Sequence, residues 1–147
     1  MGRRGFTLLE LVIVIIIVGV LASLALPRFF QTVEFSRTVE ARTAIGAIRQ
    51  AAERCYMMRG DFFNCPLDFQ GLGIDDPGAS PNAHFIYALS YGSPDYLVVQ
   101  AIRNTRDGGS FTEEVRLCQD GDRIIWCGAG KYRGLDHECP WPVNACE

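Results

Sequence analysis

A run of sixteen residues, 11–26, carries no charged side chain and is almost wholly aliphatic. With residues 6–10 included, the stretch is 21 residues long, and a helix needs roughly 20 apolar residues to span the hydrocarbon core of a bilayer. The run therefore predicts a membrane-spanning helix at the N-terminus. It leaves a globular remainder of roughly 85 residues, which can bury only a thin hydrophobic core.

A short basic leader precedes this run. Basic residues such as Arg3 and Arg4 before an apolar run are typical of a secretory signal peptide. Here, however, the basic stretch is only five residues long, and Pro27 and Arg28 follow the run in place of a small-x-small cleavage site. By the positive-inside bias, the arginines keep the N-terminus in the cytoplasm and place the rest of the chain outside. A plain signal anchor is the simplest alternative.

One acidic residue, Glu10, stands at the start of the apolar run. An ionised carboxylate in lipid costs several kcal/mol, on the order of 2 to 10. The side chain therefore either lies at a solvated flank of the membrane or has a partner.

The segment 5–10, GFTLLE, with the basic leader before it and Pro27 after it, resembles the class III signal of type IV pilins and type II secretion pseudopilins. The resemblance is strong over residues 1–60 and looser beyond them. It implies cleavage after Gly5 by a membrane aspartyl peptidase, the prepilin peptidase. The same enzyme commonly methylates the new amine on Phe6.

The resemblance also implies a partner for Glu10. In the family pattern, the glutamate of one subunit pairs with the N-terminal amine of a neighbour, which here is the amine of Phe6. Two buried opposite charges that are hydrogen-bonded together cost far less than either charge alone, and such a pair fixes register more than it adds stability. A bulky apolar Phe6 holds the terminus in the filament core. The resemblance thus implies self-association into a helical filament.

Two residues interrupt the predicted helix. Gly19 lowers helix propensity, and Pro27 removes a backbone donor, so a kink near Pro27 is expected. In related filaments the helix loses order between a glycine and a proline placed like these two. Residues 19–27 are therefore a candidate stretch that extends on assembly, and a simple kink within lipid is the alternative.

The apolar pattern changes beyond residue 40. Apolar side chains recur at spacings of three and four, which is typical of one face of a helix; they are Ala41, Ala44, Ile45, Ile48, Ala52 and Cys55. Gly60 after Arg59 suits a helix C-terminus. We expect one helix from about Phe6 to Arg59, roughly 80 Å long at 1.5 Å per residue.

Residues 61–82 are rich in glycine, proline and aspartate and are expected to form a loop. Four strand-like runs follow, at about 84–90, 96–103, 111–118 and 123–127. Short links predict an antiparallel meander that packs one face on the helix. The expected fold is α+β, divided into a cleaved leader (1–5), a transmembrane or filament-core helix (6–30), an amphipathic helix half (31–60) and a globular region (61–147).

The last two strands offer a test of register. Asp120-Gly121 is a type I′ hairpin signal, and a two-residue turn there pairs Leu117 with Ile124 and Val115 with Trp126 on one apolar face. In this register Cys118 opposes Arg123. Cys127 then lies four residues further along, roughly 13 Å away, which exceeds the Cα limit of roughly 7 Å for a disulfide.

Six cysteines lie in the region that is predicted to be exported: Cys55, Cys65, Cys118, Cys127, Cys139 and Cys146. An even number in a small exported domain predicts a disulfide framework. We expect Cys55 to bond Cys65. From the register, Cys118 and Cys127 each bond Cys139 or Cys146, in an order that stays open, so that the C-terminal loop is stapled to the sheet.

Other chemistry finds little support in the residues. A zinc site of Cys118, Cys127, His137 and Cys139 has spacings unlike those of zinc knuckles. Asp75-Asp76 and Asp120-Gly121-Asp122 resemble fragments of calcium sites but form no EF-hand loop. We therefore expect no cofactor, no metal and no enzymatic activity. The net charge is −3, and the sequence contains no dense cluster of lysine and arginine. We therefore expect no nonspecific binding of nucleic acid.

The resemblance implies a structural subunit of a type IV pilus, with a role in adhesion, motility, secretion or DNA uptake. Its implied partners are copies of itself, the prepilin peptidase and an inner-membrane assembly platform. Before assembly it is expected to lie in the inner membrane with a cytoplasmic N-terminus, and afterwards in an extracellular filament. Two alternatives stay open: a type II secretion pseudopilin, and a membrane-anchored extracytoplasmic binding domain that uses the helix only as a tether.

Overall fold

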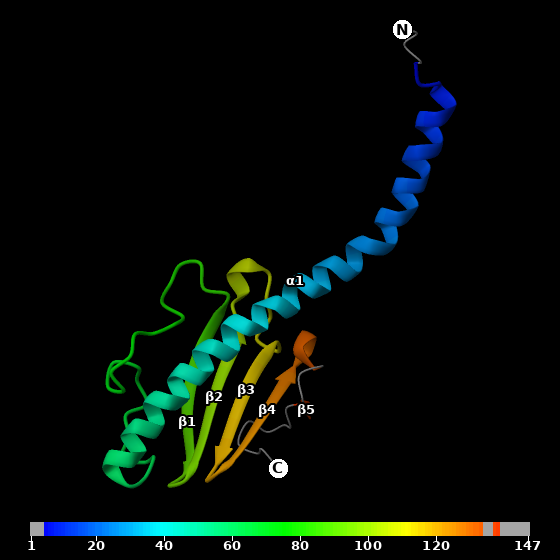
Figure 1. Ribbon diagram of the computed structural model, residues 1–147. Helices are drawn as coiled ribbons and strands as arrows, with labels where there is room; N and C mark the ends of the chain where they lie inside the picture. Colours follow the sequence, from blue (N-terminus) through cyan, green and yellow to red (C-terminus); the bar gives the residue numbers. More distant parts are fainter. Residues whose placement is uncertain (1–4, 134–136, 139–147) are drawn as a thin grey trace. The chain divides into compact units, whose positions relative to one another are not determined.

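The computed structural model describes residues 5–133 and 137–138 of the 147-residue chain. A single long helix, α1 (Leu8–Arg59), precedes a sheet formed by β1 (Phe85–Ser93), β2 (Tyr96–Arg103), β3 (Glu114–Asp120), β4 (Arg123–Ala129) and β5 (His137–Glu138) (Figure 1). Two short 3₁₀ helices, η1 (Thr105–Asp107) and η2 (Gly130–Tyr132), follow β2 and β4. The chain divides into two compact units, Met1–Ser36 and Arg37–Glu147.

The bounds of α1 agree with the sequence pattern. The helix begins two residues after the predicted start and ends at Arg59, as predicted. Gly60 follows with φ of 86°, and its N–H donates to the Tyr56 carbonyl at 2.8 Å. A glycine in this left-handed conformation is the usual way to end a helix, because it has no Cβ to clash. Gly19 and Pro27 both lie inside the helix, and a kink or extension there stays a prediction.

The sheet confirms the predicted meander and adds one strand. The strand order is β1-β2-β3-β4-β5, and the first four strands pair antiparallel with their neighbours. The fifth, β5, pairs parallel with β4 through only two residues. Because a two-residue strand is too short to show an alternating pattern, nothing in the sequence indicated it.

The predicted register of the β3–β4 hairpin is wrong. Leu117 pairs with Trp126 rather than Ile124, and Cys118 pairs with Ile125 rather than Arg123. The turn consists of Gly121 and Asp122 instead of Asp120 and Gly121, because Gly121 takes the first central position with φ of 55°. Hairpin turns of types I′ and II′ both require a positive φ at that position.

The register error leaves the assignment of faces intact, because it shifts the pairing by two residues and side chains alternate with a period of two. It does weaken one inference. Cys127 lies two residues, not four, beyond the partner of Cys118, and a diagonal neighbour of this kind lies only about 7–8 Å away. The distance between Cys118 and Cys127 in the hairpin is therefore a weaker argument against a disulfide between them than the predicted register suggested.

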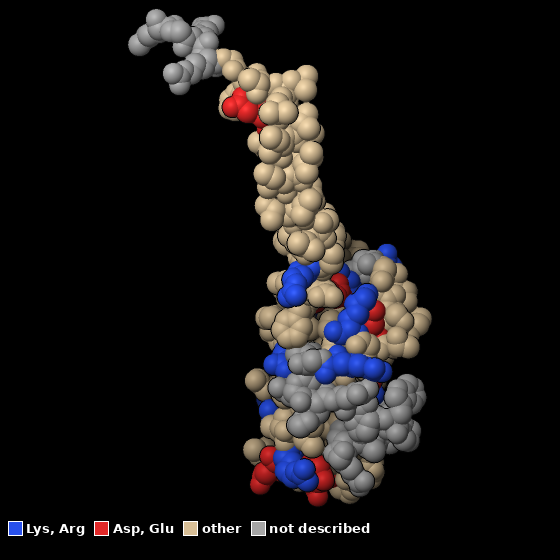
Figure 2. Space-filling model, turned by 90° about the vertical axis from the view of Figure 1, so that its right-hand side faces the viewer, with Lys and Arg blue, Asp and Glu red and all other residues tan. Residues whose placement is uncertain are grey.

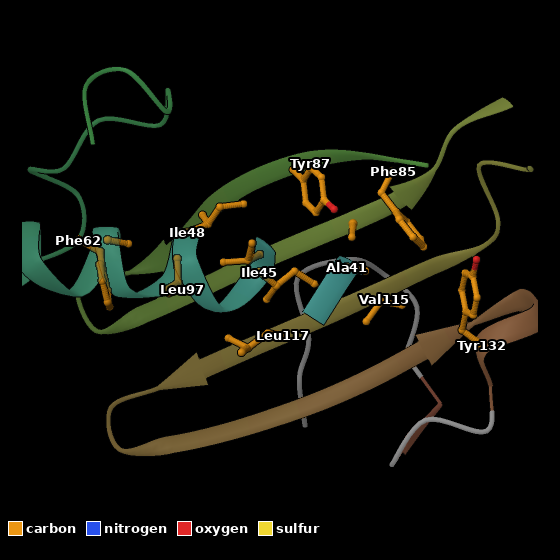
Figure 3. Packing of buried hydrophobic residues seen from close by; sticks show 13 residues of the cluster. Ala41, Ile45, Ile48, Phe62, Phe85, Tyr87, Leu97, Val115, Leu117 and Tyr132 are labelled. Carbon is orange, nitrogen blue, oxygen red and sulfur yellow. The ribbon is translucent and has the colours of Figure 1, made fainter. Parts of the chain in front are cut away.

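The core of Arg37–Glu147 forms where α1 crosses one face of the sheet (Figure 3). Its buried members are Ala41, Ile45, Ile48, Ala52, Phe62, Phe85, Tyr87, Leu97, Val99, Ala101, Val115, Leu117 and Tyr132. The predicted helix face is confirmed, with Ala44 only partly buried and Thr38 and Ala51 buried as well. Short antiparallel strands and an amphipathic helix face thus pack as two layers around one thin core.

Shortening Ile45 is expected to destabilise this core. Its side chain is fully buried, so Ile45→Ala loses apolar contacts and leaves a cavity that costs about 2–4 kcal/mol of unfolding free energy. Denaturant unfolding of the detergent-solubilised full chain measures the loss. The control is Val39→Ala on the same helix, since Val39 is 65% exposed and its truncation is expected to stay within about 0.5 kcal/mol. Equal losses in the two variants would contradict the packing described.

Candidate processing and assembly site

The residue before α1 and the third residue of α1 bind each other. The Thr7 N–H and the Thr7 hydroxyl both donate to Oε2 of Glu10, at 2.8 and 2.9 Å, and the Glu10 N–H donates to Thr7 Oγ1 at 3.2 Å. This reciprocal arrangement is a capping box, in which two side chains satisfy backbone donors that the first turn of a helix leaves unpaired. Glu10 therefore has a partner within its own chain.

The capping box was missed in the sequence, although the signal is present. Thr7 and Glu10 stand three residues apart, directly before an apolar run, and this is the usual signature of a capped N-terminus. A carboxylate in the first turn also interacts favourably with the helix dipole, by about 0.3–1 kcal/mol when exposed. The local fold alone thus gives Glu10 a structural role that does not depend on a neighbouring subunit.

The capping box leaves room for a second partner of Glu10. An ionised carboxylate offers about four lone-pair sites, and both bonds from Thr7 end on Oε2. A cation that approached Oε1 could therefore bind without displacing Thr7. The Phe6 amine exists only after cleavage between residues 5 and 6, so the predicted pairing of this amine with Glu10 stays a prediction.

Gly5 has no packing reason to be glycine. A Cβ added at Gly5 would meet nothing within 4 Å, and the same is true of Gly19 within the helix. A glycine in a helix interior costs about 0.5–1 kcal/mol relative to alanine. Packing within this chain therefore explains neither glycine.

The surface of residues 6–30 is apolar almost throughout. Every large apolar side chain from Phe6 to Phe30 is at least 40% exposed, and an 18-residue window has a mean hydropathy of 2.9. On the face shown in Figure 2, the N-terminal part of α1 is tan apart from one group of acidic atoms. By length and composition the helix can cross a membrane. Apolar patches of this extent mark a surface that lipid or another protein covers.

The four cysteines within the described residues are oxidised. Cys55 and Cys65 form a disulfide with a Cα–Cα distance of 5.9 Å, which confirms that prediction. Cys118 and Cys127 are disulfide-bonded as well, so neither offers a thiolate to zinc. Their predicted partners, Cys139 and Cys146, lie outside the described residues.

The aspartates do not gather into a metal site. Asp75 and Asp76 lie in the loop before β1, whereas Asp120 and Asp122 lie at the β3–β4 turn. Over residues 5–133 and 137–138, no group of three or more histidine, cysteine, aspartate or glutamate side chains is placed to hold a metal ion. Asp76 instead accepts a hydrogen bond from the Gly78 N–H at 2.8 Å, as a turn residue does.

Removal of the Thr7 hydroxyl is expected to loosen the first turn of α1. Thr7→Val keeps the side-chain shape but loses the N-cap bond, which contributes about 1 kcal/mol, so amide exchange at Glu10 is expected to rise about fivefold. Hydrogen exchange of the full chain in detergent measures this change. Thr32→Val is the control, because the Thr32 hydroxyl donates to the Arg28 carbonyl in the middle of the helix. Unchanged exchange at Glu10 in Thr7→Val would contradict the capping role.

A family model described as the prokaryotic N-terminal methylation motif matches residues 1–26. These are the residues that carry the leader, the capping box and the exposed apolar run. Over these residues the chain is similar to the class of proteins that carry an N-terminal methylation motif.

Comparison with curated proteins identifies the family. A probable minor fimbrial protein of Dichelobacter nodosus is 45% identical over 132 residues, which cover 84% of this chain and 79% of that protein. The type IV major fimbrial protein FimA of the same organism is 22% identical over 84% of this chain and 81% of that protein. Type II secretion system core protein G of Escherichia coli is 40% identical over 65% of this chain and 61% of that protein. The chain belongs to the type IV pilin and pseudopilin family.

The extent of the similarity varies among relatives. For the fimbrial protein EcpC of Eikenella corrodens, the match spans about half of the relative, at 39% identity over 87 residues. No solved structure matches the chain significantly.

Proposed function

We propose that this chain is a structural subunit of a type IV pilus. The observation that carries the proposal is an apolar segment, residues 6–30, whose large apolar side chains are all exposed and whose single carboxylate, that of Glu10, lies near its start. Cleavage after Gly5 creates an amine on Phe6 close to that carboxylate, and residues 6–30 then form the core of a filament. The role is structural, not enzymatic.

Transfer of residues 6–30 from the membrane to the filament core moves their apolar side chains from one apolar environment to another. Before assembly, residues 6–30 lie in the inner membrane, with Arg3 and Arg4 holding the N-terminus in the cytoplasm. In the filament the same side chains contact other helices instead of lipid, so little apolar surface meets water in either state. The prepilin peptidase and an inner-membrane assembly platform are the partners that such a route requires.

A type II secretion pseudopilin is the second candidate. The match to core protein G of Escherichia coli favours it, since pilins and pseudopilins share the processed helix. The matches to a minor and a major fimbrial protein, which each span about four fifths of this chain, favour the pilus. The two candidates differ in the expected length and surface exposure of the filament.

Electron microscopy of material sheared from cells tests the proposal. Long filaments that an antibody against Arg37–Glu147 labels along their length support a pilus subunit. Short filaments that appear only on overproduction point to the pseudopilin. A chain that stays in the membrane fraction, with no filament in either condition, would contradict both candidates and favour a tethered binding domain.

A further inference from the structure

A small groove opens at one end of the globular unit Arg37–Glu147. It lies between the last turns of α1, which contribute Tyr56 and Met57, and two turns of the sheet, which contribute Asp95 and Asp122. The two turns adjoin each other, since the Gly121 N–H donates to the Asp95 carbonyl at 3.1 Å. The groove holds about 280 Å³. This is slightly below the range of roughly 300–1,000 Å³ typical of small-molecule sites and suits one or two side chains.

The groove combines carboxylates with apolar surface. The Tyr56 hydroxyl donates to Oδ1 of Asp95 at 2.6 Å, and this bond raises the pKa of Tyr56. Asp95 and Asp122 are both exposed. Met57 in the groove is 87% exposed. Exposed apolar side chains next to carboxylates are typical of a surface that receives a partner with a positive charge and an apolar body.

The opposite end of the same sheet carries both a positive charge and an exposed apolar side chain. Antiparallel pairing places the turns at 94–95 and 121–122 at one end, and the connection 104–113 between β2 and β3 at the other (Figure 1). This connection carries Arg106, which is exposed, and Phe111, which is 68% exposed. Lys131 at the same end already binds Glu113 at 2.9 Å.

Arg106 cannot reach the groove of its own chain. The eight residues of β2 separate the two ends, which corresponds to about 27 Å at about 3.4 Å per residue. An arginine side chain is far shorter than that distance. If the two ends meet, they belong to two different copies.

We infer that the groove at Tyr56, Asp95 and Asp122 receives Arg106 and Phe111 of a second copy, so that globular units contact each other end to end. The inference rests on the proposed function, because a filament brings copies of the chain into such contact. Charge complementarity selects the partner: one end presents carboxylates around apolar surface, and the other presents a guanidinium in the same connection as an exposed ring. The contact adds specificity between neighbouring subunits to the association of their helices.

Charge reversal of each end, and of both together, tests the inference in the full chain. Arg106→Glu and Asp122→Arg are each expected to reduce sheared filament yield at least tenfold, because like charges then face each other. The double variant is expected to return to within about threefold of wild type, since it restores an opposite pair. Asp75→Arg in the loop before β1 makes the same change of charge outside the groove and is expected to leave the yield unchanged.

The level of each variant in the membrane fraction is measured alongside, so that an unfolded subunit is recognised. Arg106 tolerates substitution locally, since its hydrogen bond to the Asn104 side chain comes from the backbone N–H. Wild-type yields in both single variants, or no recovery in the double variant while all subunits are present in the membrane, would overturn the contact alone. A wild-type chain that forms no filament would overturn the proposed function and the contact with it.

Discussion

Replacement of Glu10 by glutamine is expected to abolish surface filaments while the subunit stays in the membrane at its wild-type level. Glutamine can still complete a capping box with Thr7, so the start of α1 is preserved and only the negative charge is lost. Without that charge, the amine of a neighbouring Phe6 enters an apolar interior unpaired, and an uncompensated buried charge costs about 3–5 kcal/mol. Because every subunit of a filament bears this cost, we expect filament yield to fall at least a hundredfold.

The comparison between Glu10→Gln and Thr7→Val separates two roles of the same carboxylate. Thr7→Val removes the capping hydroxyl and keeps the charge, so filaments are expected to form, with at most a severalfold lower yield. Sheared filament protein is compared with membrane-bound subunit by immunoblot for both variants. Normal filaments from Glu10→Gln, or equal losses in the two variants, would contradict a charge-pairing role for Glu10.

Replacement of Gly5 by leucine is expected to block maturation. A Cβ at this position meets nothing within 4 Å in the chain itself, so we expect the substitution to leave the fold unchanged and to affect only an enzyme that must accept a narrow backbone at the scissile bond. We expect most of the protein to accumulate in the membrane as a precursor five residues longer than the mature form. Filaments are then lost, since no Phe6 amine is released.

Gly46→Ala is the matched control for this variant. A Cβ at Gly46 also meets nothing within 4 Å, but the residue lies far from the leader in the second half of α1. It is expected to mature as the wild type does and, if anything, to stabilise the helix. Gel mobility and intact mass distinguish precursor from mature chain. Full maturation of Gly5→Leu would show that the glycine has no part in processing.

The sequence predicted the fold where a periodic pattern was long enough to be read. The helix from residue 8 to Arg59 follows from an apolar run and an amphipathic face, and Gly60 marks its end. The four-strand meander follows from alternating runs joined by short links. The hairpin register was missed, because a turn signal of aspartate and glycine fits two turns one residue apart, and only the φ of Gly121 distinguishes them.

The site was predicted less completely. The family resemblance drew attention to Glu10 as a residue that pairs between subunits and away from its local bond to Thr7, although the spacing of the two residues was visible. The end groove could not have been found in the sequence. Tyr56, Asp95 and Asp122 come from three separate elements, and only the folded chain brings them together.

The chemical identity of the mature N-terminus tests the central claim most directly. Mass spectrometry of the intact protein purified from the producing cells is predicted to find a chain that starts at Phe6, with a methyl group on its amine and no leader residue. That result would place a new positive charge, the Phe6 amine, close to Glu10, the one acidic residue of the apolar segment 6–30. A chain that still starts at Met1, or one cut beyond Leu26, would contradict the account, since the acid would then lack the cation on which polymerisation is proposed to depend.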